Sequence, residues 1–448
     1  MKRKIYNNLL DWKQESQGKS VLLLEGARRI GKSYIVEQFA KNEYKSCIII
    51  DFNRLNDEEV DIFEHYLNVT EHFLQLLQIH YGVKLYERES VIVFDEVQQY
   101  PKARAALKYL VADGRYDYIE TGSLISIKKN VKDIMIPSEE YALQMYPMDF
   151  EEFMWAMGEE QLMDYIREQF EHRQPLGPIH RKAMEFLRLY MLVGGMPSAV
   201  QAYAKTQNFK NVEREKRQIL TLYRNDIKKY ATGAETKAAA IFEDIPGQLQ
   251  RHERNFQLTD LDPNARYTNY ESAFFWLYDS RIVNICYATT EPTIGLRINT
   301  DRTRLKCYMA DTGLLISMAF DEKGSMPQGV YEKILLDKLE ANFGYLTENL
   351  VAQMLAANGH KLYFYSDTSK VAEDRMEIDF LISKPSTTNR HNIMPIEVKS
   401  GKGYRFVSLS KFKRKFAEQI AEPLIIHTAD LQTREGVLCL PLYMAAAM

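Results

Sequence analysis

The stretch that decides the fold of the N-terminal third is Val21-Leu-Leu-Leu-Glu25, followed directly by Gly26-Ala-Arg-Arg-Ile-Gly31-Lys32-Ser33. The apolar run predicts a buried strand, and the helical pattern that begins at Tyr34 predicts a helix after the glycine-rich turn. The turn fits the pattern G-x-x-x-x-G-K-S/T without a mismatch. Its two glycines let the backbone curl so that successive N–H groups point toward an anion, and the helix N-terminus adds its dipole. We therefore expect this turn to hold phosphate.

The side chains of the turn indicate a nucleotide as its ligand. Lys32 is the point charge placed for the β- and γ-phosphates, and the Ser33 hydroxyl is placed to bind Mg²⁺. Arg28 and Arg29 lie inside the turn, where they neutralise phosphate or an acid of a neighbouring subunit, or else remain in solvent. The predicted nucleotide-binding residues of the turn are Gly26, Ala27, Arg28, Arg29, Ile30, Gly31, Lys32, Ser33 and Tyr34.

A second apolar run, Val91-Ile-Val-Phe-Asp95-Glu96, ends in two acids. In a parallel sheet this end lies on the same side as the turn, so Asp95 is predicted to join the nucleotide site and to hold Mg²⁺ through water. Glu96 is predicted to polarise the attacking water. After the next strand, Thr121 and Ser123 offer hydroxyls for sensing the γ-phosphate, although a turn capped by Ser123 is the alternative. The predicted catalytic residues are Glu96, Lys32 and Ser123.

Helical patterns alternate with apolar runs over the first third of the chain. Further runs lie at Cys47–Asp51 and Tyr118–Thr121, and helices are expected around Phe63–Gln78 and over Ala103–Val111. Runs that are apolar on both faces and separated by helices predict a parallel sheet covered on both sides. We therefore expect an α/β nucleotide-binding fold that closes near Trp155.

Length and composition limit the classes of protein to consider. The chain has 448 residues, enough for about two to four domains. Its 46% hydrophobic and 27% charged residues exclude a disordered or fibrous chain. The 58 Lys+Arg against 61 Asp+Glu give a net charge of −3, so nucleic-acid binding would depend on local basic patches. Two candidates are Lys205–Lys237, with nine Lys/Arg against four Asp/Glu (a net +5), and a basic helix expected over Ser410–Ile420.

The sequence does not predict disulfides, a zinc site or a membrane segment. The four cysteines are far apart and form no C-x-x-C pair. The first 16 residues, MKRKIYNNLLDWKQES, turn polar before the apolar core of a signal peptide develops. No apolar run approaches the roughly 18 residues of a membrane-spanning helix. We expect a cytoplasmic protein with reduced thiols and no membrane partner.

The rest of the chain predicts a helical region followed by mixed segments. The pattern is helical and charged from Met157 to Lys237, and a further helix is expected over Tyr270–Tyr278. The stretch Met326–Lys338 predicts a linker into a last domain, which begins with a helix at Leu346–Asn358. Strands are expected at Ile282–Tyr287, Lys306–Met309, Leu362–Ser366, Glu377–Ser383, Ile393–Val398 and Leu424–His427.

The last domain carries a second group of charged residues. Glu397 and Lys399 are two residues apart on one expected strand and so share a face, while Asp379 lies on the strand before it. Two carboxylates and a lysine can bind a metal such as Mg²⁺, activate water and hold a phosphodiester, with Glu348 on the preceding helix as a fourth member. This set resembles the D…E-x-K core of restriction-endonuclease-like nucleases. The alternative is a salt-bridged network in an inactive fold of that type.

Several motifs carry a resemblance that covers nearly the whole chain. Besides the turn and the ends of the two strands above, they are Met145-Tyr-Pro-Met-Asp-Phe-Glu-Glu-Phe153, Gly194-Gly-Met-Pro-Ser198, Tyr223-Arg-Asn-Asp-Ile227, Lys306-Cys-Tyr-Met-Ala-Asp-Thr-Gly-Leu314 and Ile396-Glu-Val-Lys-Ser-Gly401. Together they resemble a bacterial and archaeal class of AAA-type P-loop ATPases joined to a C-terminal domain of undetermined role. Many relatives carry a Gly-Arg pair before the Tyr-Pro motif. This chain has Pro137-Ser-Glu-Glu140 there, so no arginine finger is assigned.

The resemblance implies a domain order and an activity. It implies an AAA-type ATPase core at residues 1–155, a helical region at 156–237, a winged-helix-like domain at 238–325 and a restriction-endonuclease-like α/β domain at 326–448. ATP and Mg²⁺ are the implied cofactors, and the implied function is an ATPase switch or motor acting on a nucleic-acid or protein partner. The alternatives are an ATP-gated, metal-dependent nuclease and a non-hydrolysing ATP-binding interaction module. Oligomerisation stays open.

Overall fold

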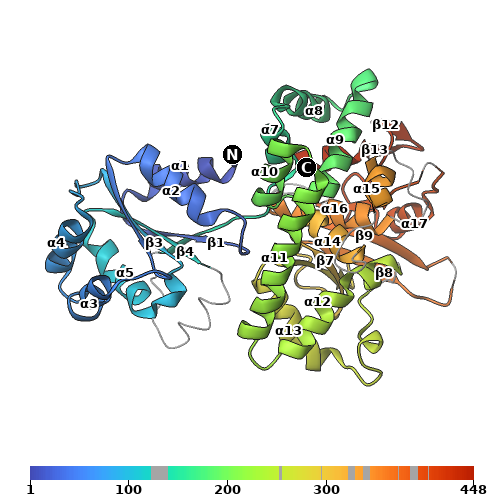
Figure 1. Cartoon of the computed structure of the whole chain (residues 1–448). Coiled ribbons are helices and arrows are strands. Elements are labelled where there is room, and N and C mark those ends of the chain that lie inside the picture. Colours follow the sequence, from blue (N-terminus) through green and yellow to red (C-terminus); the bar gives the residue numbers. More distant parts are fainter. Residues whose placement is uncertain are drawn as a thin grey trace. The chain divides into compact units, whose positions relative to one another are not determined.

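The computed structural model describes residues 1–122, 140–251, 255–293, 295–320, 328–335, 344–371, 373–383, 392–401 and 403–448. The chain forms two compact units, an N-terminal unit, Met1–Tyr146, and a C-terminal unit, Pro147–Met448. Each unit contains a sheet of its own (Figure 1). The N-terminal unit thus ends before Trp155, which lies in the first helix of the C-terminal unit. The predicted division of the remainder at residues 237 and 325 stays a prediction.

The sheet of the N-terminal unit has five strands in the order β2-β3-β4-β1-β5, and every neighbouring pair is parallel. Strand β1 lies between β4 and β5, so that Leu24 is opposite both Thr121 and Leu143. This arrangement confirms the parallel sheet expected from the sequence. Because the strands are parallel, their carboxyl ends meet at one edge, and the loops that follow β1 and β3 leave from that edge.

Helices cover both faces of this sheet. Figure 1 shows α1 and α2 on one face and α3, α4 and α5 on the other. On the second face, Phe63, Phe73 and Leu107 pack with residues of β2 and β3 in one buried core. The elements are α1 Ile5–Ser16, β1 Val21–Glu25, α2 Lys32–Glu43, β2 Ser46–Asp51, α3 Asp57–His65, α4 Thr70–Tyr81, β3 Ser90–Asp95, the short helix η1 Val97–Gln99, α5 Pro101–Asp113, β4 Asp117–Gly122 and β5 Glu140–Gln144.

Two features of this unit differ from the sequence expectation. The single helix expected around Phe63–Gln78 is two helices, because α3 ends at His65 and α4 begins at Thr70. The start of α3 is fixed by a capping box between Asn56 and Glu59. Strand β5 was not expected, since Glu140-Tyr-Ala-Leu-Gln144 has no apolar run. It is an edge strand, and its side chains are exposed or half-buried.

The C-terminal unit contains a mixed eight-stranded sheet in the order β12-β13-β11-β10-β9-β8-β6-β7. The pairs β6–β8, β10–β11 and β11–β13 are parallel, and the remaining neighbours are antiparallel. The strands are β6 Val283–Thr289, β7 Thr300–Met309, β8 Tyr363–Asp367, β9 Met376–Ser383, β10 Ile393–Lys399, β11 Leu424–His427, β12 Gln432–Arg434 and β13 Val437–Pro441.

Eleven helices are described in this unit, and the second to the fifth of them fill most of the stretch expected to be helical, Met157–Lys237. They are α7 Phe150–Ala156, α8 Glu160–His172, α9 His180–Val193, α10 Pro197–Thr206, α11 Phe209–Tyr230, α12 Glu235–Gln250, α13 Tyr267–Asp279, α14 Thr312–Ala319, α15 Gln328–Leu335, α16 Gly344–Ala357 and α17 Val407–Lys415. The short helices η2 Gly177–Ile179, η3 Leu258–Asp260 and η5 Leu442–Ala447 complete the described elements.

The stretch predicted as a linker at Met326–Lys338 is part of the fold. Its described residues form α15, where Tyr331 donates a hydrogen bond to Glu213 Oε2 at 2.8 Å and the Leu335 carbonyl accepts one from Arg188 at 3.1 Å. Strands β6 and β7, which come before this stretch, lie in the same sheet as β8 to β13, which follow it. The linker prediction is therefore wrong. The winged-helix-like and restriction-endonuclease-like assignments stay predictions. Both of these segments contribute strands to the same sheet.

Within the described parts of the chain, none of the helices combines the length and the apolar character needed to cross a bilayer.

Candidate functional site

The glycine-rich loop, residues 26–31, connects the buried strand β1 to the start of α2. Gly26 has a φ of 154°, and a Cβ there would lie 2.4 Å from the Met145 carbonyl oxygen, so only glycine fits this close backbone approach. Gly31 has a φ of 92° and caps the N-terminus of α2 in the left-handed region. The local backbone geometry therefore explains both glycines of the sequence pattern.

Lys32 is the first residue of α2, and its side chain folds back into the loop. The ammonium donates hydrogen bonds to the carbonyl oxygens of Gly26 and Ala27, both at 2.9 Å, and the residue is only 5% exposed. Burial lowers the pKa of Lys32, although the negative charges of Glu96 and Asp95 act to raise it. An anion next to this ammonium would be stabilised by a charge that has little water around it.

Ser33, Asp95 and Thr121 meet where β1, β3 and β4 end. The Ser33 hydroxyl donates to Asp95 Oδ1 at 2.9 Å, and the Thr121 hydroxyl donates to the same oxygen. Burial raises the pKa of Asp95, while these two hydrogen bonds act to lower it. Three segments distant in the sequence therefore come together around one carboxylate, beside the loop predicted to hold phosphate.

Glu96 follows Asp95, and at Glu96 the backbone leaves the direction of β3. Its φ of 56° lies in the left-handed region, and it precedes the short helix η1. The Glu96 backbone N–H donates to Thr121 Oγ1 at 3.2 Å, and Gln98 donates to the Glu96 carboxylate. The hydroxyl of Thr121 thus connects the two acids, donating to the side chain of one and accepting from the backbone of the other.

The other predicted residues of this site differ in exposure. Ala27 and Ile30 are buried and support the loop, whereas Arg28 is half-buried. Arg29 and Tyr34 are exposed, and Arg29 has a φ of 68°. Ser123 lies outside the described residues. The exposed Arg29 and Tyr34 remain available to a ligand at the edge of the site.

Arg3 is part of this site and was not predicted from the sequence. Its guanidinium donates to the Ile30 carbonyl oxygen at 2.8 Å and to the Tyr146 carbonyl oxygen at 2.7 Å, and the residue is 7% exposed. The Met145 N–H donates to the Glu25 carbonyl at 2.8 Å. The glycine-rich loop is therefore held between the N-terminal segment and residues 145–146. No motif includes Arg3, so the sequence carries no signal for this contact.

The donor set fits a magnesium nucleotide. A buried ammonium and a helix N-terminus behind a glycine-rich loop suit phosphate oxygens. The Ser33 hydroxyl and the Asp95 carboxylate supply the hard oxygen ligands that Mg²⁺ prefers. All of these groups lie within the N-terminal unit.

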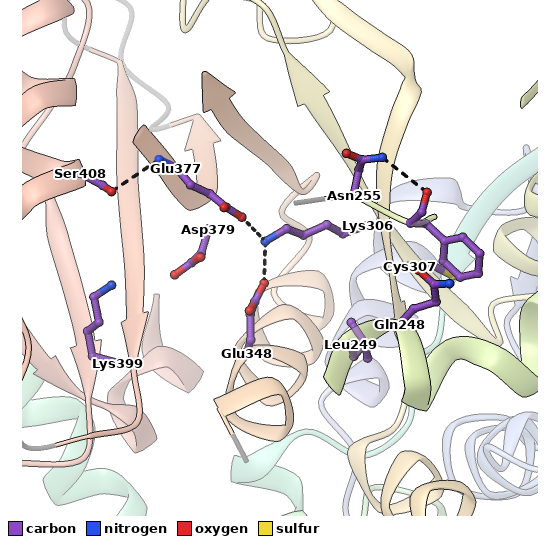
Figure 2. A pocket seen from close by; sticks show the side chains of 11 residues that line it. Gln248, Leu249, Asn255, Lys306, Cys307, Glu348, Glu377, Asp379, Lys399 and Ser408 are labelled. Carbon is purple, nitrogen blue, oxygen red and sulfur yellow. Dashed lines mark hydrogen bonds and ion pairs between the residues drawn. The ribbon is translucent and has the colours of Figure 1, made fainter. Parts of the chain in front are cut away.

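Two of the acids predicted in the C-terminal unit, Asp379 and Glu348, line a cavity of about 220 Å³, which we call the acidic pocket. Figure 2 shows Lys306 of β7 directed between Glu348 of α16 and Glu377 of β9, with Asp379 and Lys399 beside them. The remaining lining residues are Gln248, Leu249, Asn255, Phe256, Cys307 and Ser408. Asp379, Lys399 and Glu348 are thus brought together as predicted, whereas Glu397 is not among the lining residues.

The contacts in the acidic pocket differ from those of the predicted metal site. Lys306 Nζ lies 2.9 Å from Glu348 Oε1 and 3.0 Å from Glu377 Oε1. Asp379 Oδ2 accepts a hydrogen bond from the Val398 N–H at 2.8 Å. Among the residues that the structure describes, no three His, Cys, Asp or Glu side chains are placed to hold a metal ion together. The predicted pair of metal ligands, Asp379 and Glu397, stays a prediction.

The prediction that Glu397 and Lys399 share a face of their strand is confirmed. Lys399 Nζ lies 3.1 Å from Glu397 Oε2, and Glu397 is 2% exposed. Burial raises the pKa of Glu397, and it raises the pKa of Asp379 to about 7, with Glu348 adding to the effect. Burial acts to lower the pKa of Lys399, but Glu397 and Asp379 outweigh it and the pKa is raised.

Lys306 and Glu377 were missed as pocket residues, although the sequence held a signal for Lys306. Lys306 and Tyr308 are two residues apart on an expected strand, so they share a face, and both donate to Glu348. A lysine and a tyrosine on the same face of an apolar strand indicate a charged partner nearby.

Many cations of the two predicted basic patches are used within the fold. In the first, Lys216 is buried and bonds the Leu192 carbonyl at 2.8 Å, and Arg224 is paired with Glu243 at 2.6 and 2.9 Å. In α17, Lys415 is paired with Asp367 at 2.9 Å and Lys411 donates to the Arg375 carbonyl at 3.1 Å. The exposed lysines left in the first patch are Lys205, Lys210, Lys228 and Lys229.

Solved structures give weak likenesses to archaeal proteins. A Walker-type ATPase of Pyrococcus abyssi is 15% identical, covering 71% of this chain and 95% of that one, with a TM-score of 0.40. Cdc6p of Pyrobaculum aerophilum is 11% identical, covering 76% and 96%, with a TM-score of 0.28. The ORC2 protein of Aeropyrum pernix in its ADP form is 12% identical, covering 75% and 93%, with a TM-score of 0.31. At these scores, the likenesses have no bearing on function.

Family models match three successive parts of the chain. An AAA domain matches residues 18–154, and two domains of unknown function, DUF8612 and DUF4143, match residues 184–325 and 343–444. No curated protein matches the chain significantly. The AAA match contains β1, the glycine-rich loop and β3, whereas Arg3 lies outside it. The chain therefore carries an AAA-type, P-loop ATPase-like domain at its N-terminus, followed by segments similar to domains whose role is undetermined.

Proposed function

We propose that the chain binds and hydrolyses ATP at the glycine-rich loop, and that this cycle changes how the C-terminal unit engages a partner. The observation that carries the proposal is the contact between Ser33 of α2 and Asp95 of β3, 2.9 Å apart, beside the buried ammonium of Lys32. A structural turn would explain the two glycines of the loop. It would not explain a buried lysine and a serine–aspartate pair at the same strand ends.

Lys32 is the proposed ligand of the β- and γ-phosphates. Its two hydrogen bonds to the carbonyls of Gly26 and Ala27 are exchanged for bonds to phosphate oxygens. The loop N–H groups and the N-terminus of α2 hold the remaining charge. Arg28, Arg29 and Tyr34 lie at the half-buried and exposed edge of the site, where they border the nucleotide.

Ser33 and Asp95 are the proposed magnesium ligands, Ser33 directly and Asp95 through water. Bound Mg²⁺ supplies positive charge that offsets the negative charge developing on the transferred phosphoryl group. In the present structure the two side chains bond each other, so the hydroxyl proton of Ser33 turns away from Asp95 when its oxygen becomes a ligand. Thr121 continues to donate to Asp95 and fixes its orientation.

Glu96 is the proposed general base. Its carboxylate accepts a hydrogen bond from Gln98, and its backbone is held by Thr121, so both neighbours orient the acid. A carboxylate in this position takes a proton from the attacking water. Ser123 is proposed as a second γ-phosphate contact, from its place two residues after Thr121 in the sequence.

The test measures ATP binding and phosphate release by the full-length chain. Lys32→Ala removes the ammonium, so ATP affinity measured by titration calorimetry with Mg²⁺ should fall by at least about 100-fold. Glu96→Gln should keep ATP affinity within about threefold of the wild type and slow phosphate release by about 10²–10⁴-fold. Lys41→Ala is the matched control, since Lys41 is an exposed lysine of the same helix.

Two results would count against the proposal. If the wild type binds neither ATP nor ADP at millimolar nucleotide, the chain is not a nucleotide-binding protein. If Glu96→Gln releases phosphate at the wild-type rate, Glu96 is not the base. Repeating the assay with single- and double-stranded DNA and RNA identifies a nucleic-acid partner by a change in rate, and an unchanged rate favours a protein partner.

A further inference from the structure

The acidic pocket of the C-terminal unit contains carboxylates that all receive a hydrogen bond or an ion pair from the chain itself. Glu348 and Glu377 are both paired with Lys306, at 2.9 and 3.0 Å. Asp379 accepts the Val398 N–H, and Glu397 behind the pocket is paired with Lys399. Two ammonium groups and a backbone N–H are thus among the partners of these four acids.

Lys306 has the central place in this arrangement. Its side chain is 8% exposed, and its ammonium lies between acids that come from two different elements, α16 and β9 (Figure 2). Tyr308, on the same face of β7, donates to the same Glu348 carboxylate. The pairing with β6 fixes the register of β7, with Lys306 opposite Cys286, so the ammonium is placed by the sheet and not by a mobile loop.

We propose that Lys306 is the resident cation of the acidic pocket. Its ammonium takes the position between Glu348 and Glu377 that a divalent metal ion would need, and it supplies the positive charge that these carboxylates require. The pocket therefore does not take up Mg²⁺ or Mn²⁺, and the C-terminal unit does not cleave phosphodiesters through a metal at this place. The proposal is independent of the ATPase.

The physical basis is competition for the same oxygen atoms. A divalent ion binds carboxylate oxygens at about 2.1 Å, inside the space that the Lys306 ammonium fills. The ion and the ammonium would repel each other at that range, and displacing the ammonium would leave it buried without its two partners. Asp379 gives little help to a metal, because one of its oxygens is committed to the Val398 backbone.

Replacing Lys306 should create a metal site. Lys306→Met keeps most of the length of the side chain and removes the positive charge that lies between Glu348 and Glu377. We expect Mn²⁺ to bind this variant at least about tenfold more tightly than the wild type. The measurement is a titration of the EDTA-treated full-length chain at about pH 8 without nucleotide, followed by the electron paramagnetic resonance signal of free Mn²⁺.

Two further variants make the test specific. The gain should disappear in the double variant Lys306→Met, Glu348→Gln, and it should be absent from Lys361→Met, which removes an exposed lysine outside the pocket. Any weak Mn²⁺ binding at Ser33 and Asp95 is the same in all these chains. A folded Lys306→Met variant, judged by circular dichroism, that binds Mn²⁺ no better than the wild type overturns the proposal.

The wild type provides a test that does not depend on the folding of Lys306→Met. Glu348→Gln should leave the Mn²⁺ binding of the wild type unchanged, because no metal reaches Glu348 while Lys306 is present. An unchanged titration supports a resident ammonium. A Mn²⁺ site in the wild type that is lost in Glu348→Gln contradicts it.

Discussion

Lys32 and Lys306 are both buried, yet their pKa values move in opposite directions. Burial lowers the pKa of Lys32, whose ammonium bonds two neutral carbonyls. Burial acts in the same way on Lys306, but Glu348 and Glu377 outweigh it and the pKa is raised. A lysine with carbonyl partners gains by exchanging them for an anion, whereas a lysine between two carboxylates is already neutralised. The first suits a ligand site and the second suits a closed network.

At the same scale, Arg3 is predicted to be a positioning residue for the nucleotide site. Its two hydrogen bonds fix the Ile30 carbonyl of the loop and the Tyr146 carbonyl at the end of the unit. Arg3→Met keeps most of the stem and removes both donors, so the loop loses a support that it needs in order to receive phosphate. We expect ATP affinity to fall about tenfold, corresponding to about 1.4 kcal/mol, as measured by titration calorimetry.

Lys19→Met is the control for Arg3→Met, because it removes an exposed cation from the same unit. The rate of phosphate release at saturating ATP should stay close to the wild-type rate, since Arg3 holds the loop and not the acids. An Arg3→Met variant with normal ATP affinity would show that the contact supports only the packing of α1.

We predict that Asp379 makes the stability of the protein depend on pH. Burial raises its pKa to about 7, whereas an unfolded aspartate ionises near pH 3.9. Unfolding therefore releases a proton between these values, so the contribution of Asp379 to stability falls as pH rises from about 4 to 7 and is constant above. Asp379→Asn cannot ionise and keeps an acceptor for Val398. The melting temperature of this variant relative to the wild type should rise from pH 5 to pH 8. A difference in melting temperature that stays the same from pH 5 to pH 8 would contradict this prediction.

Among the secondary-structure elements, apolar runs were predicted well and edge elements were not. Strand β11 was expected at its observed bounds, Leu424–His427, because four apolar or aromatic residues in a row have no other place than the core. Strands β5 and β12 lie at sheet edges, where partly exposed side chains leave no apolar run. Helix α15 was missed because Gln328–Leu335 follows a polar stretch, and its place depends on contacts distant in sequence, such as Tyr331 with Glu213.

Helix α17 divides its four cations between the fold and the solvent. Lys411 and Lys415 bond groups of the same unit, while Lys413 and Arg414 are exposed and have no ion pair among the described residues. If α17 contacts a nucleic acid, Lys413 and Arg414 are the residues that reach phosphate. Lys413→Gln with Arg414→Gln should then reduce the slope of log affinity against log salt by up to about 1.8 for duplex DNA, as measured by fluorescence anisotropy.

The matched variant for this helix is Lys411→Gln with Lys415→Gln. It removes cations that are committed to Arg375 and Asp367, so it should lower the melting temperature and leave the salt slope nearly unchanged. Equal slopes for the wild type and for Lys413→Gln with Arg414→Gln would remove α17 from any nucleic-acid interface.

At the scale of the whole molecule, the sequence predicted the N-terminal site better than the C-terminal one. Lys32 and Ser33 follow β1 and Asp95 ends β3, two parallel strands with β4 between them, so the positions of these residues relative to their strands predict that they meet at one edge of the sheet. Arg3 reaches the loop from 27 residues away, outside any motif. Lys306 and Glu348 are 42 residues apart on a strand and a helix. Only the packing of α16 against β7 shows that they meet.

The two compact units predict two separable unfolding transitions. Each unit has its own sheet and its own buried core, so calorimetry of the full-length chain should resolve one transition for each. In the Glu96→Gln variant, ATP with Mg²⁺ at about 100 times the dissociation constant should stabilise the N-terminal unit by about 2.7 kcal/mol. Adding Lys32→Ala should abolish that shift. Asp379→Asn at pH 8 should shift only the transition of the C-terminal unit. A single transition that shifts as a whole with ATP would show that the units unfold together.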